Sequence, residues 1–467
     1  MSTSEPEATS NTPDATSPHP DVDAALADLA EGEKTWADLS LAGRRKLLDK
    51  VHDLTVQHAA DWVDTAVAIK GLDPKSPLVG EEWMSGPYPL ATGTAALSAS
   101  LAKLEAGSSP LDGATFGTAP GGRTTVKALP LNIFDKLLLS GFSADVWLQP
   151  GIDRATAQRD AGLAQRDPSR TQGIGVVLGA GNITSIAPLD TLYELIAHNR
   201  VVALKLNPIT DRLLVAAQAV VVSSEWKQRD EFVAALKEAL DTAPDRAAYY
   251  PGSDSRVAGA KASFPTAARL GENGGRVLVT DLEPGAYAPL LQTEYFAPVL
   301  GVIDLPHGGA EFAAHAADLV NEDFIGTLGV NIVAAPQTIR ELGAEFDSLL
   351  ESLRYGTIAV NAWTGVGYLT ATATWGAFPG HTLDDVQSGI GVVHNALLID
   401  RPERTVVRGP FRPSPRSILN REMSISPKPP WFVTNRTAAT TGRLLTGFAG
   451  APSWTRLPAI FASALRG

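Results

Sequence analysis

Residues 173–208 hold the pattern that most constrains the fold of this chain. Two apolar runs, GIGVVLGAG and VVALKLNP, flank a stretch of helical character, TSIAPLDTLYELIAHN. Two buried strands joined by a helix pair in parallel through a right-handed crossover, and ligands bind beyond the carboxyl ends of such strands. The segment therefore predicts a parallel, Rossmann-type sheet with a candidate site where its strands end.

Other segments continue this alternation on both sides of residues 173–208. Residues 21–69 have helical periodicity, and spacings of three or four predict one buried face: Leu47, Val51, Leu54, His58 and Trp62. Short apolar runs at 128–131, 137–139 and 146–148 predict strands or a hairpin arm. Helices are expected downstream near 230–240 and 310–320, and strands near 276–279, 298–303, 329–334 and 357–361. The pattern is α/β throughout.

The charge distribution excludes several classes of partner. The formal net charge is −12, although residues 401–467 carry eleven Lys or Arg against two Asp or Glu. An acidic body disfavours wholesale binding to nucleic acid or to an anionic membrane, because both need a positive surface. The basic segment is expected to pack against its own body or a neighbouring subunit; contact with a membrane surface or an anionic partner is the alternative.

Three segments, in the same order along the chain, resemble the aldehyde dehydrogenase superfamily. GVVLGAGNITSIAPLD with IAHNRVVALKLNP resembles the cofactor-domain signature, QTEYFAPVLGVI resembles the Glu-Ile-Phe-Gly-Pro-Val-Leu signature, and YGTIAVNAW resembles a later strand of the catalytic domain. The segment WADLSLAGRRKLLDKV is similar to the family's opening helices. The resemblance covers most of the chain and implies a parallel Rossmann-type sheet, a second α/β catalytic lobe and a C-terminal arm.

The resemblance also implies roles for four residues. Asn182 matches the asparagine whose amide donates to the oxyanion formed when a thiolate attacks the aldehyde carbon. Lys205 matches the lysine that hydrogen-bonds the adenine-side ribose of NAD or NADP. Glu294 matches the glutamate that holds the nicotinamide ribose, and Phe296 matches the phenylalanine that contacts the nicotinamide end. An aldehyde substrate, NAD or NADP as cofactor, and a homo-oligomer are implied in the same way.

Each of these residues also has a structural interpretation. Asn182 could cap a helix that begins at Thr184. Lys205 could be a solvated lysine at the end of a strand, and Glu294 could be a structural carboxylate bonded to backbone groups. GSDSRVAG at 252–259 resembles the family's Gly-Ser-Thr-Glu-Val-Gly pyrophosphate turn at a helix N-terminus, but it follows a helix and not a strand, which favours a plain surface turn. The eight histidines show no metal-binding spacing, so no metal site is predicted.

The sequence departs from the family pattern in two ways, and these differences lead to the prediction about function. The chain contains no cysteine, and thiolate catalysis is therefore excluded. Only 88 residues separate Lys205 from Glu294, less than half the interval that the resemblance implies. The missing length should hold the pyrophosphate turn, the Glu-Leu-Gly-Gly segment with the general base, and the cysteine loop. Residues 213–220 offer no Ser or Thr in place of the thiol.

We therefore expect a cytoplasmic family member whose aldehyde chemistry is impaired or absent. The predicted division is a disordered tail at 1–20, an incomplete cofactor-binding domain at 21–222, a remnant of the catalytic α/β domain at 223–400, and a basic C-terminal arm at 401–467. No apolar run predicts a membrane-spanning helix. Three hypotheses stay open: an active oxidoreductase using unconventional residues, a noncatalytic nucleotide-binding or oligomerisation subunit, and the product of an internal deletion or faulty gene model.

Overall fold

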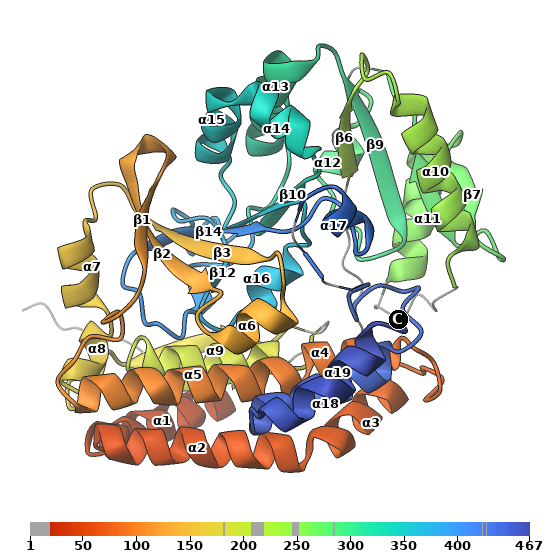
Figure 1. Cartoon of the computed structure of the whole chain (residues 1–467). Coiled ribbons are helices and arrows are strands. Elements are labelled where there is room, and N and C mark those ends of the chain that lie inside the picture. The colour runs from red at the N-terminus through yellow and green to blue at the C-terminus, as the bar shows by residue number, and fades with distance from the viewer. Residues whose placement is uncertain are drawn as a thin grey trace, which may run out of the picture.

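A computed structural model describes residues 19–180, 183–206, 219–244, 252–283, 285–422, 424–425 and 427–467. Helices of the N-terminal quarter form one layer, and strands from both ends of the chain lie above it (Figure 1). Of the predicted tail at 1–20, residues 1–18 lie outside the described part.

A six-stranded mixed sheet occupies the centre of the fold. Its order is β1 (Phe116–Ala119), β2 (Arg123–Leu129), β3 (Ser143–Leu148), β14 (Pro402–Arg408), β11 (Thr357–Val360) and β10 (Gly329–Ile332). The pairs from β1 to β14 are antiparallel, and those from β14 to β10 are parallel. β14 falls inside the range 401–467 that was predicted as an arm, so a central strand of the body comes from that basic segment.

A second sheet of four strands forms a separate lobe. Its order is β6 (Ala219–Ser223), β9 (Val299–Leu305), β8 (Arg276–Val279) and β7 (Ala268–Leu270), with only the last pair antiparallel. The helices that accompany it are α10 (Arg229–Thr242), α11 (Ser253–Ser263), α12 (Ala288–Leu291) and α13 (Gly309–Glu322). The predicted boundary at 222/223 falls within β6, whose pairing with β9 places it in this lobe.

Residues 173–208, predicted to form strand, helix and strand, contribute a sheet of only two strands. β4 (Ile174–Leu178) and β5 (Val201–Lys205) pair in parallel, and α9 (Ile186–Ile196) connects them. One face is covered, with Val177 5% exposed, whereas Val176 and Leu178 on the other face are each 70% exposed. Parallel sheets are normally covered on both faces. The open face of β4 is therefore unusual for a parallel sheet, and the predicted incomplete cofactor domain stays a prediction.

The N-terminal helices pack on a different face from the one predicted. The range 21–69 contains α1 (Pro20–Ala37), α2 (Leu41–Gln57) and α3 (Ala59–Ile69), followed by α4 (Val79–Ser85) and α5 (Pro87–Glu105). Leu47 and Leu54 are exposed, whereas Arg44 and Leu48 are buried, so the predicted buried face of the second helix is wrong.

Arg44 explains this difference, because its charge is satisfied inside the protein. Its guanidinium donates to the side-chain oxygens of Gln165 and Asn199, at 2.8 and 2.5 Å, and to three backbone carbonyls. It also stacks over the Trp36 ring, 4.1 Å from the centroid. A periodicity of apolar residues cannot anticipate a buried arginine, since arginine is rarely buried without such partners.

The segment 137–139, predicted as a strand, is instead part of a helix or its end. α6 (Ile133–Leu138) begins with a capping box, in which Asn132 accepts from the backbone N–H of Asp135 and the Asp135 carboxylate accepts from Asn132. These reciprocal bonds satisfy backbone donors of the first turn and favour the helix over an extended conformation. The neighbouring runs at 128–131 and 146–148 do contribute to β2 and β3.

The C-terminal helices lie on the helical layer of the same chain, in agreement with the expectation that the basic segment packs against its own body. α18 (Ala438–Gly450) packs against α4 and α5, and α19 (Leu457–Ala464) packs beside α18 (Figure 1). The close approach requires glycine at position 80, because a Cβ there would lie 2.4 Å from the Ala438 backbone.

The remaining short elements complete the described fold. They are α7 (Arg154–Asp160), α8 (Leu163–Arg166), α14 (Pro336–Leu342), α15 (Ala344–Ser352), α16 (Gly365–Leu369), α17 (Arg416–Leu419), β12 (Thr374–Gly376) and β13 (Val392–His394). The predicted α/β class is confirmed. Within the described ranges no helix has both the length and the apolar character to cross a membrane.

The open face of β4 and β5 generates a prediction about solubility. Leu178→Thr should reduce binding of a hydrophobic dye and slow aggregation, because it removes apolar surface from contact with water. Its free energy of unfolding should change by less than about 0.5 kcal/mol. Val177→Thr is the control: it places a hydroxyl on the covered face and should cost about 1–3 kcal/mol in urea denaturation. Equal effects of the two substitutions would contradict the exposure described here.

Candidate functional site

The ends of β4 and β5 form the first part of the candidate site. The backbone N–H of Gly179 donates to the Lys205 carbonyl at 2.9 Å, so the two strands end together. Asn182, the predicted oxyanion donor, lies outside the described residues. α9 begins at Ile186, and its N-cap residue is Ser185. The helix expected to begin at Thr184 therefore begins two residues later, and the roles predicted for Asn182 stay predictions.

Lys205 is the last residue of β5, and its side chain is exposed. Leu206, which follows it, is also exposed. This placement matches a solvated lysine at a strand end. It also leaves the amine free to meet a ligand from solvent, so the contact with a cofactor ribose stays a prediction.

The segment with Glu294 and Phe296 lies directly before β9. Phe296 has a left-handed backbone, with φ of 43°, and its carbonyl accepts a hydrogen bond from Ser253 Oγ at 3.0 Å. Although the Glu294 side chain is exposed overall, partial desolvation raises the pKa of its carboxyl, and Arg256 opposes that shift. The predicted contacts of Glu294 and Phe296 with a nicotinamide ribose stay predictions.

The segment 252–259 begins a helix, so its interpretation as a plain surface turn is wrong. Gly252 has φ of 79° at the N-cap, and Ser253, 2% exposed, is the first residue of α11. A helix N-terminus attracts anions through its free N–H groups. Here, however, Asp254 stands in the first turn, and its carboxylate competes with any phosphate for that position.

The predicted cofactor residues occupy two different sheets. Lys205 ends the two-stranded sheet, whereas Glu294 and Phe296 precede β9 of the four-stranded sheet. What the structure does bring together is Phe296 and the beginning of α11. No sequence pattern predicted this contact, because 43 residues separate Ser253 from Phe296.

A buried polar cluster beneath α9 was missed by the sequence analysis. Ser185 Oγ donates to the Ser85 carbonyl at 2.5 Å and contacts the hydroxyl of Tyr368. The Tyr368 ring lies 4.6 Å from the ring of His394, centroid to centroid. Nearly two hundred residues separate Ser185 from Tyr368, so no local pattern could predict this cluster.

Burial shifts the pKa values of the titratable groups in and beside this cluster towards their uncharged forms. It lowers the pKa of His394 to about 4, since the charged imidazolium is poorly solvated there. It raises the pKa of Asp190 to about 7, and the nearby Glu194 carboxylate adds to the shift. Within the described part of the chain, Oδ1 of Asp190 has no hydrogen-bond partner. Because Ser185 is fully buried, the cluster supports α9 and offers no reachable nucleophile.

Asp190 makes stability depend on pH in a defined direction. The unfolded carboxyl loses its proton near pH 3.8, whereas the folded one keeps it until about pH 7, so stability falls as pH rises between these values. Asp190→Asn removes this loss and should raise the free energy of unfolding by about 2–4 kcal/mol at pH 8. The gain should shrink towards pH 4. Urea denaturation at both pH values tests this, and a variant that is less stable at pH 8 would contradict it.

The chain matches no model of a known protein family, and no curated protein matches it. Among solved structures it is similar to aldehyde dehydrogenase 21 from Physcomitrella patens (12% identity, TM-score 0.44, 84% of this chain and 90% of that one). It is also similar to an NADP-dependent glyceraldehyde-3-phosphate dehydrogenase from Bacillus halodurans (14% identity, TM-score 0.46, 84% of this chain and 91% of that one). A third similar structure is an aldehyde dehydrogenase from Brucella melitensis (12% identity, TM-score 0.44, 84% of this chain and 89% of that one). At such identities, function has to be argued from the residues.

Proposed function

We propose that this chain is an internally shortened, aldehyde-dehydrogenase-like protein that does not oxidise aldehydes. One observation carries the proposal: the sequence contains no cysteine. Thiol-based oxidation begins when a thiolate adds to the aldehyde carbon, and a hydroxyl replaces a thiolate only with a strong base beside it. The buried Ser185, which bonds a backbone carbonyl, has no such access to substrate.

The length of the connection after β5 supports the same proposal. β5 ends at Lys205 and β6 begins at Ala219, which leaves residues 206–218 between the two sheets. By resemblance, this interval should contain the pyrophosphate turn, the general base and the nucleophile loop. The exposed face of β4 agrees with the loss of neighbouring elements, as an internal deletion or a faulty gene model would produce. A homo-oligomer, an aldehyde ligand and a cytoplasmic location stay predictions.

The test is an assay for reduced cofactor with the purified full-length chain. Aldehydes of increasing chain length, with NAD or NADP, should give no reduced nicotinamide above the rate without protein, because no covalent adduct can form. Cooperative thermal unfolding of the same sample is the control that the protein is folded. Sustained aldehyde-dependent reduction would reject the proposal.

A second candidate function is nucleotide binding without turnover. The observation that favours it is the contact between Ser253, at the beginning of α11, and Phe296, in the segment that resembles the nicotinamide-side signature. A dinucleotide at this place would have its phosphates near the free N–H groups of the first turn. Asp254 in the same turn would weaken that binding by repulsion.

Asp254 therefore provides the test of this second function. Asp254→Asn should tighten NAD or NADP binding about two- to fivefold in calorimetry, because one negative charge leaves the helix N-terminus. Asp230→Asn, in the first turn of α10, is the matched control and should leave binding unchanged. If the unmodified chain and Asp254→Asn both release no heat with either cofactor, nucleotide binding at α11 is rejected.

A further inference from the structure

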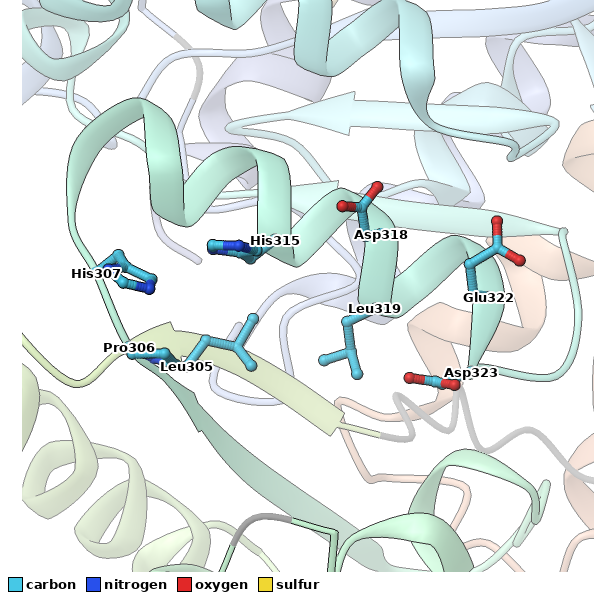
Figure 2. Close-up of a pocket in the computed structure, with 8 residues that line it drawn as sticks. All are labelled: Leu305, Pro306, His307, His315, Asp318, Leu319, Glu322 and Asp323. Atoms are coloured by element: carbon cyan, nitrogen blue, oxygen red, sulfur yellow. The ribbon is translucent and has the colours of Figure 1, made fainter.

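An open hollow lies where β9 passes into α13, and none of the residues predicted to contact a cofactor lines it. Figure 2 shows its side chains along one side of α13 and on the turn before it. Eight residues line it: Leu305, Pro306, His307, His315, Asp318, Leu319, Glu322 and Asp323. None of them is a lysine or an arginine, and three carry carboxylates. One of these, Glu322, is paired with Arg354.

Three potential ligand atoms meet at one end of this hollow. They belong to His307, Glu311 and His315, and all lie within 4.8 Å of one another. His307 Nδ1 is 3.3 Å from Glu311 Oε1, and the two imidazole rings are 5.0 Å apart, centroid to centroid. His307 is half-buried, and the other two are exposed, so an ion from solvent can reach them.

The fold fixes the position of His307 before any ligand binds. Its backbone is left-handed, with φ of 73°, and its carbonyl accepts a hydrogen bond from Ser223 Oγ at 2.5 Å. Ser223 ends β6, and His307 follows the end of its parallel neighbour β9. The residue is thus anchored across the carboxyl edge of the sheet. This anchoring holds its ring beside α13, where Glu311 and His315 occupy positions one turn apart.

We propose that His307, Glu311 and His315 bind a divalent first-row transition ion such as Zn²⁺. Two imidazoles and a carboxylate form a donor set that suits Zn²⁺, whereas Mg²⁺ and Ca²⁺ prefer oxygen ligands alone. Ligands of a tetrahedral Zn²⁺ lie about 3.4 Å apart, so closing the site needs shifts of about 1 Å in exposed side chains. The fourth position is open to water.

These three residues match no known zinc-binding motif, so the sequence predicted no metal site. The signal was present as two spacings of four, from His307 to Glu311 and from Glu311 to His315. On a continuous helix, such spacings place three side chains along one face. His307, however, precedes the helix, and only its left-handed turn returns the ring towards that face. This proposal does not depend on the proposed function.

The experiment is calorimetric titration of Zn²⁺ into the full chain, purified without a histidine tag and freed of metal with a chelator. We expect one equivalent to bind, and bound Zn²⁺ to raise the melting temperature. His315→Ala and Glu311→Gln should each weaken Zn²⁺ binding at least about tenfold. Removing a residue that only hydrogen-bonds a metal ligand already lowers metal affinity by about that factor. Both residues are exposed, so the variants should fold.

His58→Ala is the matched control. His58 is an exposed histidine 3.3 Å from the carboxylate of Asp61, but among the residues that the structure describes it belongs to no such group of three ligands. This variant should bind Zn²⁺ as the unmodified chain does. The proposal is overturned if the unmodified chain binds no Zn²⁺, if His315→Ala binds it equally well, or if Mg²⁺ competes at a similar concentration.

Discussion

The pairing of β14 with β3 and β11 is the constraint on which the rest of this structure depends. β14 comes from near the C-terminus, yet it runs antiparallel to β3 and parallel to β11 in the middle of the six-stranded sheet. Residues of all three strands share one core, including Val146, Ala359 and Val407. On the opposite face of the sheet, Arg404 lies against a second core that includes Trp147, Leu350 and Leu353. Its guanidinium donates there to backbone carbonyls and to Glu403. Without β14, the two halves of the sheet would have no common neighbour.

The two-stranded sheet of β4 and β5 contrasts with this central sheet, because only one of its faces is covered. β4 and β5 keep one covered face, and Asn199, directly before β5, bonds Arg44 of the helical layer. Their other face is open.

Much of the local structure follows from residues close together in the sequence. The strand–helix–strand unit at 173–208 and the alternation near 276–361 were predictable because burial on a regular element repeats with a fixed period. The absence of cysteine determined which chemistry is excluded without any structure. The predicted helix face at Leu47 and Leu54 failed because Arg44, a charged residue, takes the buried position.

Sequence by itself determined the α/β class, the order of most elements and the absence of a thiol nucleophile. Only the tertiary structure decided that β14 is a central strand, that Ser185 and His394 both contact Tyr368, and that Ser253 contacts Phe296. It also decided that His307 turns back towards Glu311 and His315. The spacing of apolar residues predicts which face of a helix or strand is buried. Which element packs against that face depends on contacts between residues far apart in the chain.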